Sequence, residues 1–324
     1  MPVMGTDAAA IAAGAAALAA GHLVAFPTET VYGLGADALD PTAVARIFTA
    51  KGRPTDHPLI CHVASPDGLA ALVADVTPEA RALADAFWPG PLTLVMPRSP
   101  AVPDAVTGGR DTVAVRVPAH PLALALLHAF GGPVAAPSAN AFGRPSPTRA
   151  QDVVEELGDS VAVVIDGGPC EIGIESTVLD LTTDPPQVLR PGAIGAAQVA
   201  HVLGRPVAAE ASGPARAPGM LESHYAPGAR VEVVGDLAAA AARALALSGD
   251  GHGVGLIAPG PVDDGGGAVV LVAADSPDDY AARLYAAFRR ADAQALNVIV
   301  AVPPAAEGIG IAVRDRLERA AAVR

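Results

Sequence analysis

Hydrogen-bonding side chains directly follow a short apolar run near the start of the chain. Residues 23–26 read Leu-Val-Ala-Phe, which predicts a strand, and the next residues carry hydroxyl groups, a carboxylate and two glycines: Thr28, Glu29, Thr30, Tyr32, Gly33 and Gly35. Pro27 fixes one backbone dihedral angle and the glycines allow close backbone approach, so the polar groups are presented at a strand end. An ordinary strand-to-helix turn has the same composition, so the segment needs support from the rest of the chain.

Further segments combine cationic, hydroxyl and amide groups near predicted turns. They are residues 51–62 (KGRPTDHPLICH), 112–117 (TVAVRV), 136–146 (APSANAFGRPS), 173–177 (GIEST) and 189–192 (LRPG). A nucleotide site needs cations for the phosphates and hydroxyl or amide donors between them. These groups are supplied by Lys51, Arg53, Ser138, Asn140, Ser146 and Arg190. Each alone is typical of a solvated surface, but together they favour a nucleotide site, with the arginines at 53, 116, 144 and 190 gathered in a cleft.

Arg116 stands near the end of an apolar strand, where a guanidinium without a partner would be costly. It is therefore suited to clamp a carboxylate, and a structural ion pair with one of the many acidic side chains is the alternative. Glu29 and Asp37 are candidates for orienting water or Mg²⁺. A carboxylate beside a glycine turn is, however, more often a cap or an ion-pair partner.

The order and spacing of these segments resembles the Sua5/YrdC family, the threonylcarbamoyl-adenylate synthases. Residues 217–227 (APGMLESHYAP), followed by about a hundred further residues, are similar to the linker and extra domain of the long, Sua5-type members. Two departures stand out. His57 occupies a position where the family often has asparagine, and residues 221–223 (LES) replace residues that are basic or aromatic in many members.

The resemblance implies a set of site residues. L-Threonine would be contacted by Thr30, His62, Arg116, the backbone of Ala136 and Ser176. The ATP side would be lined by Arg53, His57, Thr112, Ser138, Asn140, Ser146, Arg190 and Tyr225, and catalysis would rest on Lys51, Arg53 and Arg116. Alternation along the strand places His62 on the opposite face from Cys61.

The resemblance also implies the reaction. The amine of threonine captures carbon dioxide or bicarbonate, and the resulting carbamate oxygen attacks the α-phosphorus of ATP and releases pyrophosphate. ATP is then a substrate, and Mg²⁺ is held mainly by its phosphates, with no metal site made by the protein. The product, threonylcarbamoyl-AMP, would pass to a separate transferase complex that modifies the adenosine next to the anticodon of certain tRNAs, which implies transient contact with that complex.

Composition limits the alternatives. A formal net charge of −13 disfavours tight non-specific nucleic-acid binding, because phosphate backbones are repelled. Cys61 and Cys170 are the only cysteines and lie in no metal-binding or disulfide pattern, which favours a cytoplasmic protein. The alanine-rich segment 7–20 lacks the basic start of a signal peptide and predicts a first helix capped by Thr6 or Asp7. No apolar run is long enough to span a membrane.

The pattern of apolar runs predicts an α/β fold with two domains. Over residues 1–208, strands are expected at 23–26, 59–63, 92–96, 112–117, 134–136, 161–165 and 178–181, and helices at 41–50, 78–86, 121–130 and 148–157. Short strands joined through prolines favour a mixed sheet. The resemblance implies the same, a twisted YrdC-like sheet with a concave face.

The last third of the chain predicts a smaller Rossmann-like domain. Residues 209–228 have no helix or strand pattern and predict a linker that folds over the active site. Over residues 229–324, strands at 231–234, 253–257, 268–272 and 297–302 alternate with helices at 237–247, 277–291 and 309–322, which predicts a parallel sheet. This domain contains no catalytic group of its own, so its expected task is support, lid control or docking.

Two other functions are alternatives. One is an RNA-binding module, which would need a basic stripe that the net charge argues against; weak RNA binding remains compatible with the sequence. The other is carbamoyl adenylation in hydrogenase maturation, where a similar domain occurs within a larger protein. That protein has zinc-binding segments, and this chain has no cysteine pairs to form them.

Overall fold

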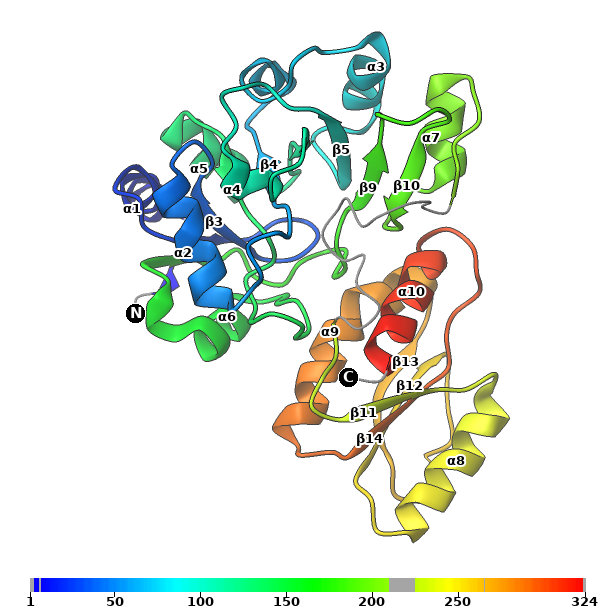
Figure 1. Ribbon diagram of the computed structural model, residues 1–324. Helices are drawn as coiled ribbons and strands as arrows, with labels where there is room; N and C mark the ends of the chain where they lie inside the picture. The colour runs from blue at the N-terminus through cyan, green and yellow to red at the C-terminus, as the bar shows by residue number, and fades with distance from the viewer. Residues whose placement is uncertain (1–2, 6, 210–224, 265, 323–324) are drawn as a thin grey trace. The chain divides into compact units, whose positions relative to one another are not determined.

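A computed structural model describes residues 3–5, 7–209, 225–264 and 266–322 as two compact units (Figure 1). The first unit comprises the described residues up to 142, together with 147–171 and 175–209. The second comprises residues 143–146, 172–174 and the described residues from 225 onward. Most of the predicted linker, residues 210–224, lies outside the described residues, as does Thr6.

The first unit alternates strands with short helices. Its strands are β1 (Val3–Met4), β2 (Val24–Phe26), β3 (Gly33–Asp37), β4 (Ile60–His62), β5 (Leu92–Pro97), β6 (Thr112–Arg116), β7 (Val134–Ala135), β8 (Val163–Ile165), β9 (Thr177–Asp180) and β10 (Gln187–Arg190). Its α-helices are α1 (Ala8–Ala19), α2 (Pro41–Lys51), α3 (Pro78–Phe87), α4 (Asp104–Thr107), α5 (Pro121–Phe130), α6 (Ala150–Leu157) and α7 (Ala196–Leu203). Two 3₁₀ turns occupy Pro66–Ala71 and Gly158–Ser160.

The described strands of this unit form one mixed sheet in the order β1-β8-β2-β3-β7-β4-β6-β5-β9-β10. Neighbours such as β4 and β6 run parallel, whereas β2 and β3, and β5 and β6, run antiparallel. A mixed α/β sheet is the fold class that the sequence predicts, and the prediction is confirmed. Residues far apart in the chain, on β4, β6, β5 and β9, thereby become neighbours across four adjacent strands.

Helix starts follow the proline and capping signals. Pro41, Pro78 and Pro121 each open a helix, and Asp7 caps α1 by accepting a hydrogen bond from the backbone N–H of Ala10 at 2.8 Å. Helix α6 begins two residues later than expected. The N–H groups of residues 148 and 149 both donate to Asp152 Oδ2, so these residues form the cap and not the first turn.

The glycine-rich segment after β2 forms a strand that was not predicted from the sequence, and not the strand-to-helix turn that was the alternative interpretation. Residues 33–37 pair antiparallel with β2 as β3. A Cβ atom at Gly35 would lie 2.9 Å from Phe26 Cε1 and 2.8 Å from Val134 Cγ1. Glycine is therefore needed here because neighbouring side chains fill the space above the strand. The polar segment 28–32 is the connection between two antiparallel strands.

The second unit has the predicted Rossmann-like arrangement. Strands β11 (Arg230–Val233), β12 (Val254–Pro259), β13 (Val269–Ala274) and β14 (Val298–Ala301) form a parallel sheet in the order β11-β14-β12-β13. Helices α9 (Pro277–Ala293) and α10 (Ile309–Ala321) lie on one face and α8 (Leu237–Gly249) on the other (Figure 1). No helix in the described ranges has the length and apolar content to cross a membrane.

Candidate active site

The strand register of the first sheet places four polar residues in a row: His62, Arg116, Thr93 and Ser176. His62 on β4 pairs with Arg116 on β6. Leu94 on β5 pairs with Val115, so Thr93 follows as the neighbour of Arg116. Thr93 Oγ1 in turn lies 2.8 Å from Ser176 Oγ, just before β9. Strand pairing therefore assembles these side chains at one edge of the sheet.

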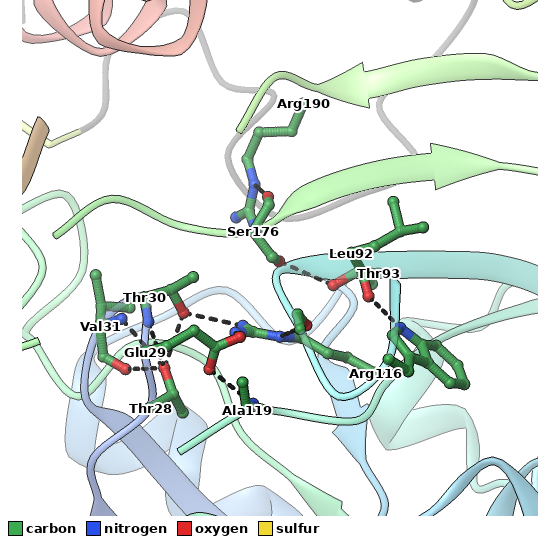
Figure 2. A network of polar contacts seen from close by, with 12 residues as sticks. Thr28, Glu29, Thr30, Val31, Leu92, Thr93, Arg116, Ala119, Ser176 and Arg190 are labelled. Atoms are coloured by element: carbon green, nitrogen blue, oxygen red, sulfur yellow. Dashed lines mark hydrogen bonds and ion pairs between the residues drawn. The ribbon is translucent and has the colours of Figure 1, made fainter. Parts of the chain in front are cut away.

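Arg116 is buried and is held by three acceptors (Figure 2). Its Nη2 donates to Glu29 Oε1 at 2.5 Å, its Nη1 to Thr30 Oγ1 at 2.9 Å and its Nε to the carbonyl oxygen of Gly90 at 3.0 Å. A guanidinium has five N–H groups, so one on each terminal nitrogen has no acceptor among the described residues. Arg116 is thus in a structural ion pair, and it still has two N–H groups for a ligand carboxylate.

Glu29 is an ion-pair partner of Arg116. From the sequence, this role is the more common alternative to orienting water or Mg²⁺. Its Oε2 accepts the backbone N–H of Ala119 at 3.0 Å, while its Oε1 receives the guanidinium. Asp37 likewise acts as a cap, because its Oδ1 accepts the N–H of Leu39 at 2.9 Å. Both carboxylates thus accept hydrogen bonds from groups of the protein. In the described part of the chain, no group of three or more His, Cys, Asp or Glu side chains could hold a metal ion.

His62 and Ala136 lie on the strands beside Arg116. Burial, and secondarily the charge of Arg116, lowers the pKa of His62 to about 3, so its imidazole is neutral near pH 7. The N–H of Ala136 donates to the carbonyl oxygen of Ile60 at 2.9 Å. The N–H is thus used within the protein, and a contact between the backbone of Ala136 and threonine stays a prediction.

Ser176 contacts both Arg190 and Thr93. Arg190 on β10 donates from Nε to the carbonyl oxygen of Ser176 and from Nη2 to its Oγ, both at 3.1 Å (Figure 2). Thr93 binds the same hydroxyl from the other side. Arg190 and Ser176, predicted to face ATP and threonine respectively, are thus in direct contact.

Lys51 is buried at the end of α2. Its Nζ donates to the carbonyl oxygens of Ser138, at 2.5 Å, and Asn140. Burial, and then the nearby charge of Arg53, lowers the pKa of this ammonium well below its usual value. An anionic ligand would offset both effects. Through these contacts, Lys51, Arg53, Ser138 and Asn140 lie close together.

Two further predicted residues of the ATP side lie nearer the surface. His57 is half-buried, its ring centre 5.5 Å from that of Phe142, and burial and Arg53 lower its pKa. Thr112 begins β6, at the opposite end of this strand from Arg116 and thus roughly 13 Å away along it. The structure does not bring Thr112 to the row around Arg116.

The remaining predicted residues belong to the second unit. Ser146 is fully buried, and Arg144 Nη2 donates to Asp292 Oδ2 at 2.8 Å, so this arginine is in an ion pair within that unit. Tyr225 is also buried, its ring centre 5.7 Å from that of Tyr285. Roles for Ser146 and Tyr225 beside ATP stay predictions.

Thr93 is the site residue that sequence reasoning missed. It is fully buried in an otherwise apolar strand, Leu92–Pro97. A buried hydroxyl requires a hydrogen-bond partner, so a threonine within such a run was a usable signal. Glu175, also buried, lies within a quoted segment but was given no role.

Fold and site together define an α/β protein with buried cationic and hydroxyl side chains at one edge of its sheet. These side chains are suited to bind small anionic groups. A family model described as "Telomere recombination" (Sua5_yciO_yrdC) matches residues 16–192. A second, described as "Threonylcarbamoyl-AMP synthase, C-terminal domain" (Sua5_C), matches residues 194–322.

Individual relatives agree with these family models. Threonylcarbamoyl-AMP synthase of Pyrococcus abyssi is 46% identical over 314 residues, which cover 94% of this chain and 92% of the relative. The Bacillus subtilis protein of the same name is 40% identical over 330 residues, covering 97% and 93%. The solved structure described as P. abyssi Sua5 complexed with L-threonine matches with a TM-score of 0.90 at 44% identity, covering 96% of this chain and 94% of that one. The chain belongs to the Sua5/YrdC family, as a long Sua5-type member.

Proposed function

We propose that this chain is a threonylcarbamoyl-AMP synthase, which forms threonylcarbamoyl-AMP and pyrophosphate from L-threonine, carbon dioxide or bicarbonate, and ATP. The observation that carries the proposal is the incompletely bonded guanidinium of Arg116, which is buried among Thr30, His62 and Ser176. The family relationship and the relatives of the same name support it.

Threonine would bind with its carboxylate on the two remaining N–H groups of Arg116. Glu29 offsets the guanidinium charge, so the pocket has no excess charge before a zwitterionic amino acid enters. The carbonyl of Ala136 is an acceptor for the amine. A neutral His62 adds no cation to repel that amine.

ATP would bind on the side of Lys51, Arg53 and Arg190. Lys51 Nζ has a third N–H beyond its two carbonyl partners, and a buried ammonium donates strongly to phosphate. The contact of Arg190 with Ser176 joins this side to the threonine pocket. Catalysis then rests on holding the carbamate oxygen in line with the α-phosphorus and stabilising the charge that develops there.

Mg²⁺ would enter as the complex with ATP, held mainly by phosphate oxygens. Oxygen-rich coordination by substrate phosphates is common for this ion. The product would serve the threonylcarbamoyl modification of adenosine in tRNA, with transient contact to a transferase complex in the cytoplasm. Any direct RNA contact would be weak, because the chain carries a net charge of −13.

The test is pyrophosphate release from ATP and Mg²⁺, with threonine and bicarbonate omitted in turn. We expect release to require both. Release that continues at the same rate without threonine would overturn the proposal, and salt-sensitive retention of tRNA would then favour the RNA-binding alternative.

A further inference from the structure

Thr28 has one hydroxyl proton, and its contacts determine where that proton lies. Its Oγ1 is 2.6 Å from the carbonyl oxygen of Val31, and a carbonyl can only accept. The proton of Thr28 is therefore donated to Val31. Thr28 Oγ1 is also 2.8 Å from Thr30 Oγ1. Because Thr28 has no second proton, Thr30 must be the donor in that contact.

The same reasoning fixes the hydroxyl of Thr30. Its single proton points to Thr28, and one of its two lone pairs accepts from Arg116 Nη1 at 2.9 Å. Both threonines are buried. What remains on Thr30 is one lone pair. Toward a ligand, Thr30 is an acceptor only.

The ligand group that meets Thr30 must then be a donor. Threonine offers two, its ammonium and its β-hydroxyl. The guanidinium of Arg116, in hydrogen-bond contact with the same oxygen, disfavours a second cation there. The amine must also lose its charge to attack carbon dioxide. The β-hydroxyl is neutral and donates without either conflict.

We propose that Thr28 is a positioning residue that makes Thr30 accept a hydrogen bond from the β-hydroxyl of L-threonine, and so makes the site select for a substrate that donates at this position. This inference rests on the proposed function. Thr28 itself need not touch the substrate. It acts by fixing the proton of Thr30, which occupies one lone pair of Thr28 Oγ1 at 2.8 Å. The backbone N–H groups of Thr30 and Val31, both at the longer distance of 3.2 Å, share the second lone pair and hold Thr28 in place.

The test uses a substrate analogue in which fluorine replaces the β-hydroxyl of threonine at the same configuration. Fluorine is close in size and can accept weakly but cannot donate. We expect wild-type kcat/KM for pyrophosphate release to favour threonine over the analogue by at least about 100-fold, since a site built to pair with a hydroxyl rejects a ligand lacking it.

In Thr28→Val, which keeps the side-chain shape, the proton of Thr30 loses its acceptor and becomes free to point at the ligand. We expect the preference for threonine over the fluoro analogue to fall at least about tenfold. The comparison uses the ratio of the two substrates within each variant, so a lower amine basicity of the analogue or a general loss of activity cancels. A merely structural role of Thr28 would lower both rates together and leave the ratio unchanged.

Thr107→Val is the matched control. Thr107 is equally buried, and within the described part of the chain its hydroxyl has no hydrogen-bond partner. Its replacement should leave the substrate ratio at the wild-type value. An unchanged ratio in folded Thr28→Val, or a wild type that uses both substrates equally well, would overturn the inference alone. Failure of the wild type to use threonine at all would instead overturn the proposed function.

Discussion

The two units treat buried polar side chains very differently. In the described part of the first unit, residues with charges or hydrogen-bonding groups are buried in large number, among them Thr28, Glu29, Thr30, Lys51, Arg53, His62, Thr93, Arg116, Asn140, Glu175, Ser176 and Arg190. In the described part of the second, Ser146 and Arg316 are the buried polar residues apart from tyrosines. Burial of such groups is costly, so their concentration in the first unit indicates a ligand site there.

One buried guanidinium from each unit, Arg116 and Arg316, shows the same difference at closer range. Arg116 has acceptors for three of its five N–H groups within the described structure. Arg316, by contrast, donates to Asp315 at 2.5 Å and places its Cζ 5.1 Å from the ring centre of Tyr225, an arrangement typical of a cation–π contact. The first arginine keeps capacity for a ligand; the second is used in packing. This contrast predicts which substitutions remove activity and which remove only stability.

Arg116→Ala should have the largest effect. Two charge-assisted hydrogen bonds to a carboxylate contribute about 3–6 kcal/mol, so kcat/KM for threonine should fall roughly 10²- to 10⁴-fold. Glu29 would also be left buried without its partner, which costs about 3–5 kcal/mol of unfolding free energy. Pyrophosphate release and urea unfolding measure the two effects separately.

A double variant separates the clamp from the ion pair. Replacing Glu29 and Arg116 together removes both buried charges, so stability should recover much of the loss. Activity should not recover, because the carboxylate of threonine still lacks its partner. Arg98→Ala is the control, since Arg98 pairs with the exposed Asp104 and should change stability by less than about 1 kcal/mol. Recovery of activity in the double variant would show that Arg116 has only a structural role.

Lys51→Met should have the next largest effect. One hydrogen bond from a buried ammonium to phosphate contributes about 1.5–3 kcal/mol, so kcat/KM for ATP should fall roughly 10- to 150-fold while the KM for threonine changes little. Lys51 is the only lysine of the chain, so an amine-reactive reagent can modify only it and the N-terminal amine. ATP should slow modification of Lys51. Equal modification rates with and without saturating ATP would remove Lys51 from the ATP side.

His62 supplies a smaller effect that depends on pH. Its folded-state pKa of about 3 lies below the usual 6.5, so between these values the unfolded chain binds a proton that the folded protein does not. The free energy of unfolding therefore rises with pH across this window, and the contribution is lost as pH falls from about 6.5 toward 3. His62→Gln should flatten the pH dependence of urea unfolding in this range.

Cys61→Ala is the matched control on the same strand. Burial raises the pKa of the Cys61 thiol to about 12, so it does not titrate in the acid range. Its removal should lower stability by a similar amount at each pH, because only a buried apolar volume is lost. A pH slope that stays at the wild-type value in His62→Gln would show that another group causes the acid sensitivity.

The sequence predicted more of the fold than of the site's hydrogen bonding. Apolar runs such as residues 112–117 and 161–165 were sufficient to predict strands. Gly33–Asp37 was missed because its glycines are required by the packing of Phe26, which sequence spacing does not reveal. Gln187–Arg190 was also missed, since only two of its four residues are apolar.

The same limit applies within the site. Residue types and order were enough to select Thr30, Arg116 and Ser176. Which of their atoms remain available depends largely on partners far away in the chain, such as the contact of Arg116 with Glu29, 87 residues apart. Thr93 could be suspected from its place in an apolar run, but its contact with Ser176 follows from the strand register. The residue types of the site could be predicted from the sequence. Which group donates and which accepts in each hydrogen bond could be assigned only from the folded structure.

Arg316→Met should have the smallest effect on catalysis and so tests the contrast between the units most strictly. Methionine keeps much of the side-chain volume but removes the contacts with Asp315 and Tyr225, so the second unit should unfold several degrees lower in a thermal scan. If this arginine serves packing alone, kcat/KM for threonine and ATP should change less than about threefold below that transition. Arg319→Met, which removes a partly exposed ion pair with the same Asp315, is the control and should shift the transition less. A tenfold loss of ATP use in folded Arg316→Met would instead mean that the packing around Tyr225 matters to catalysis, as expected if Tyr225 contributes to the ATP side.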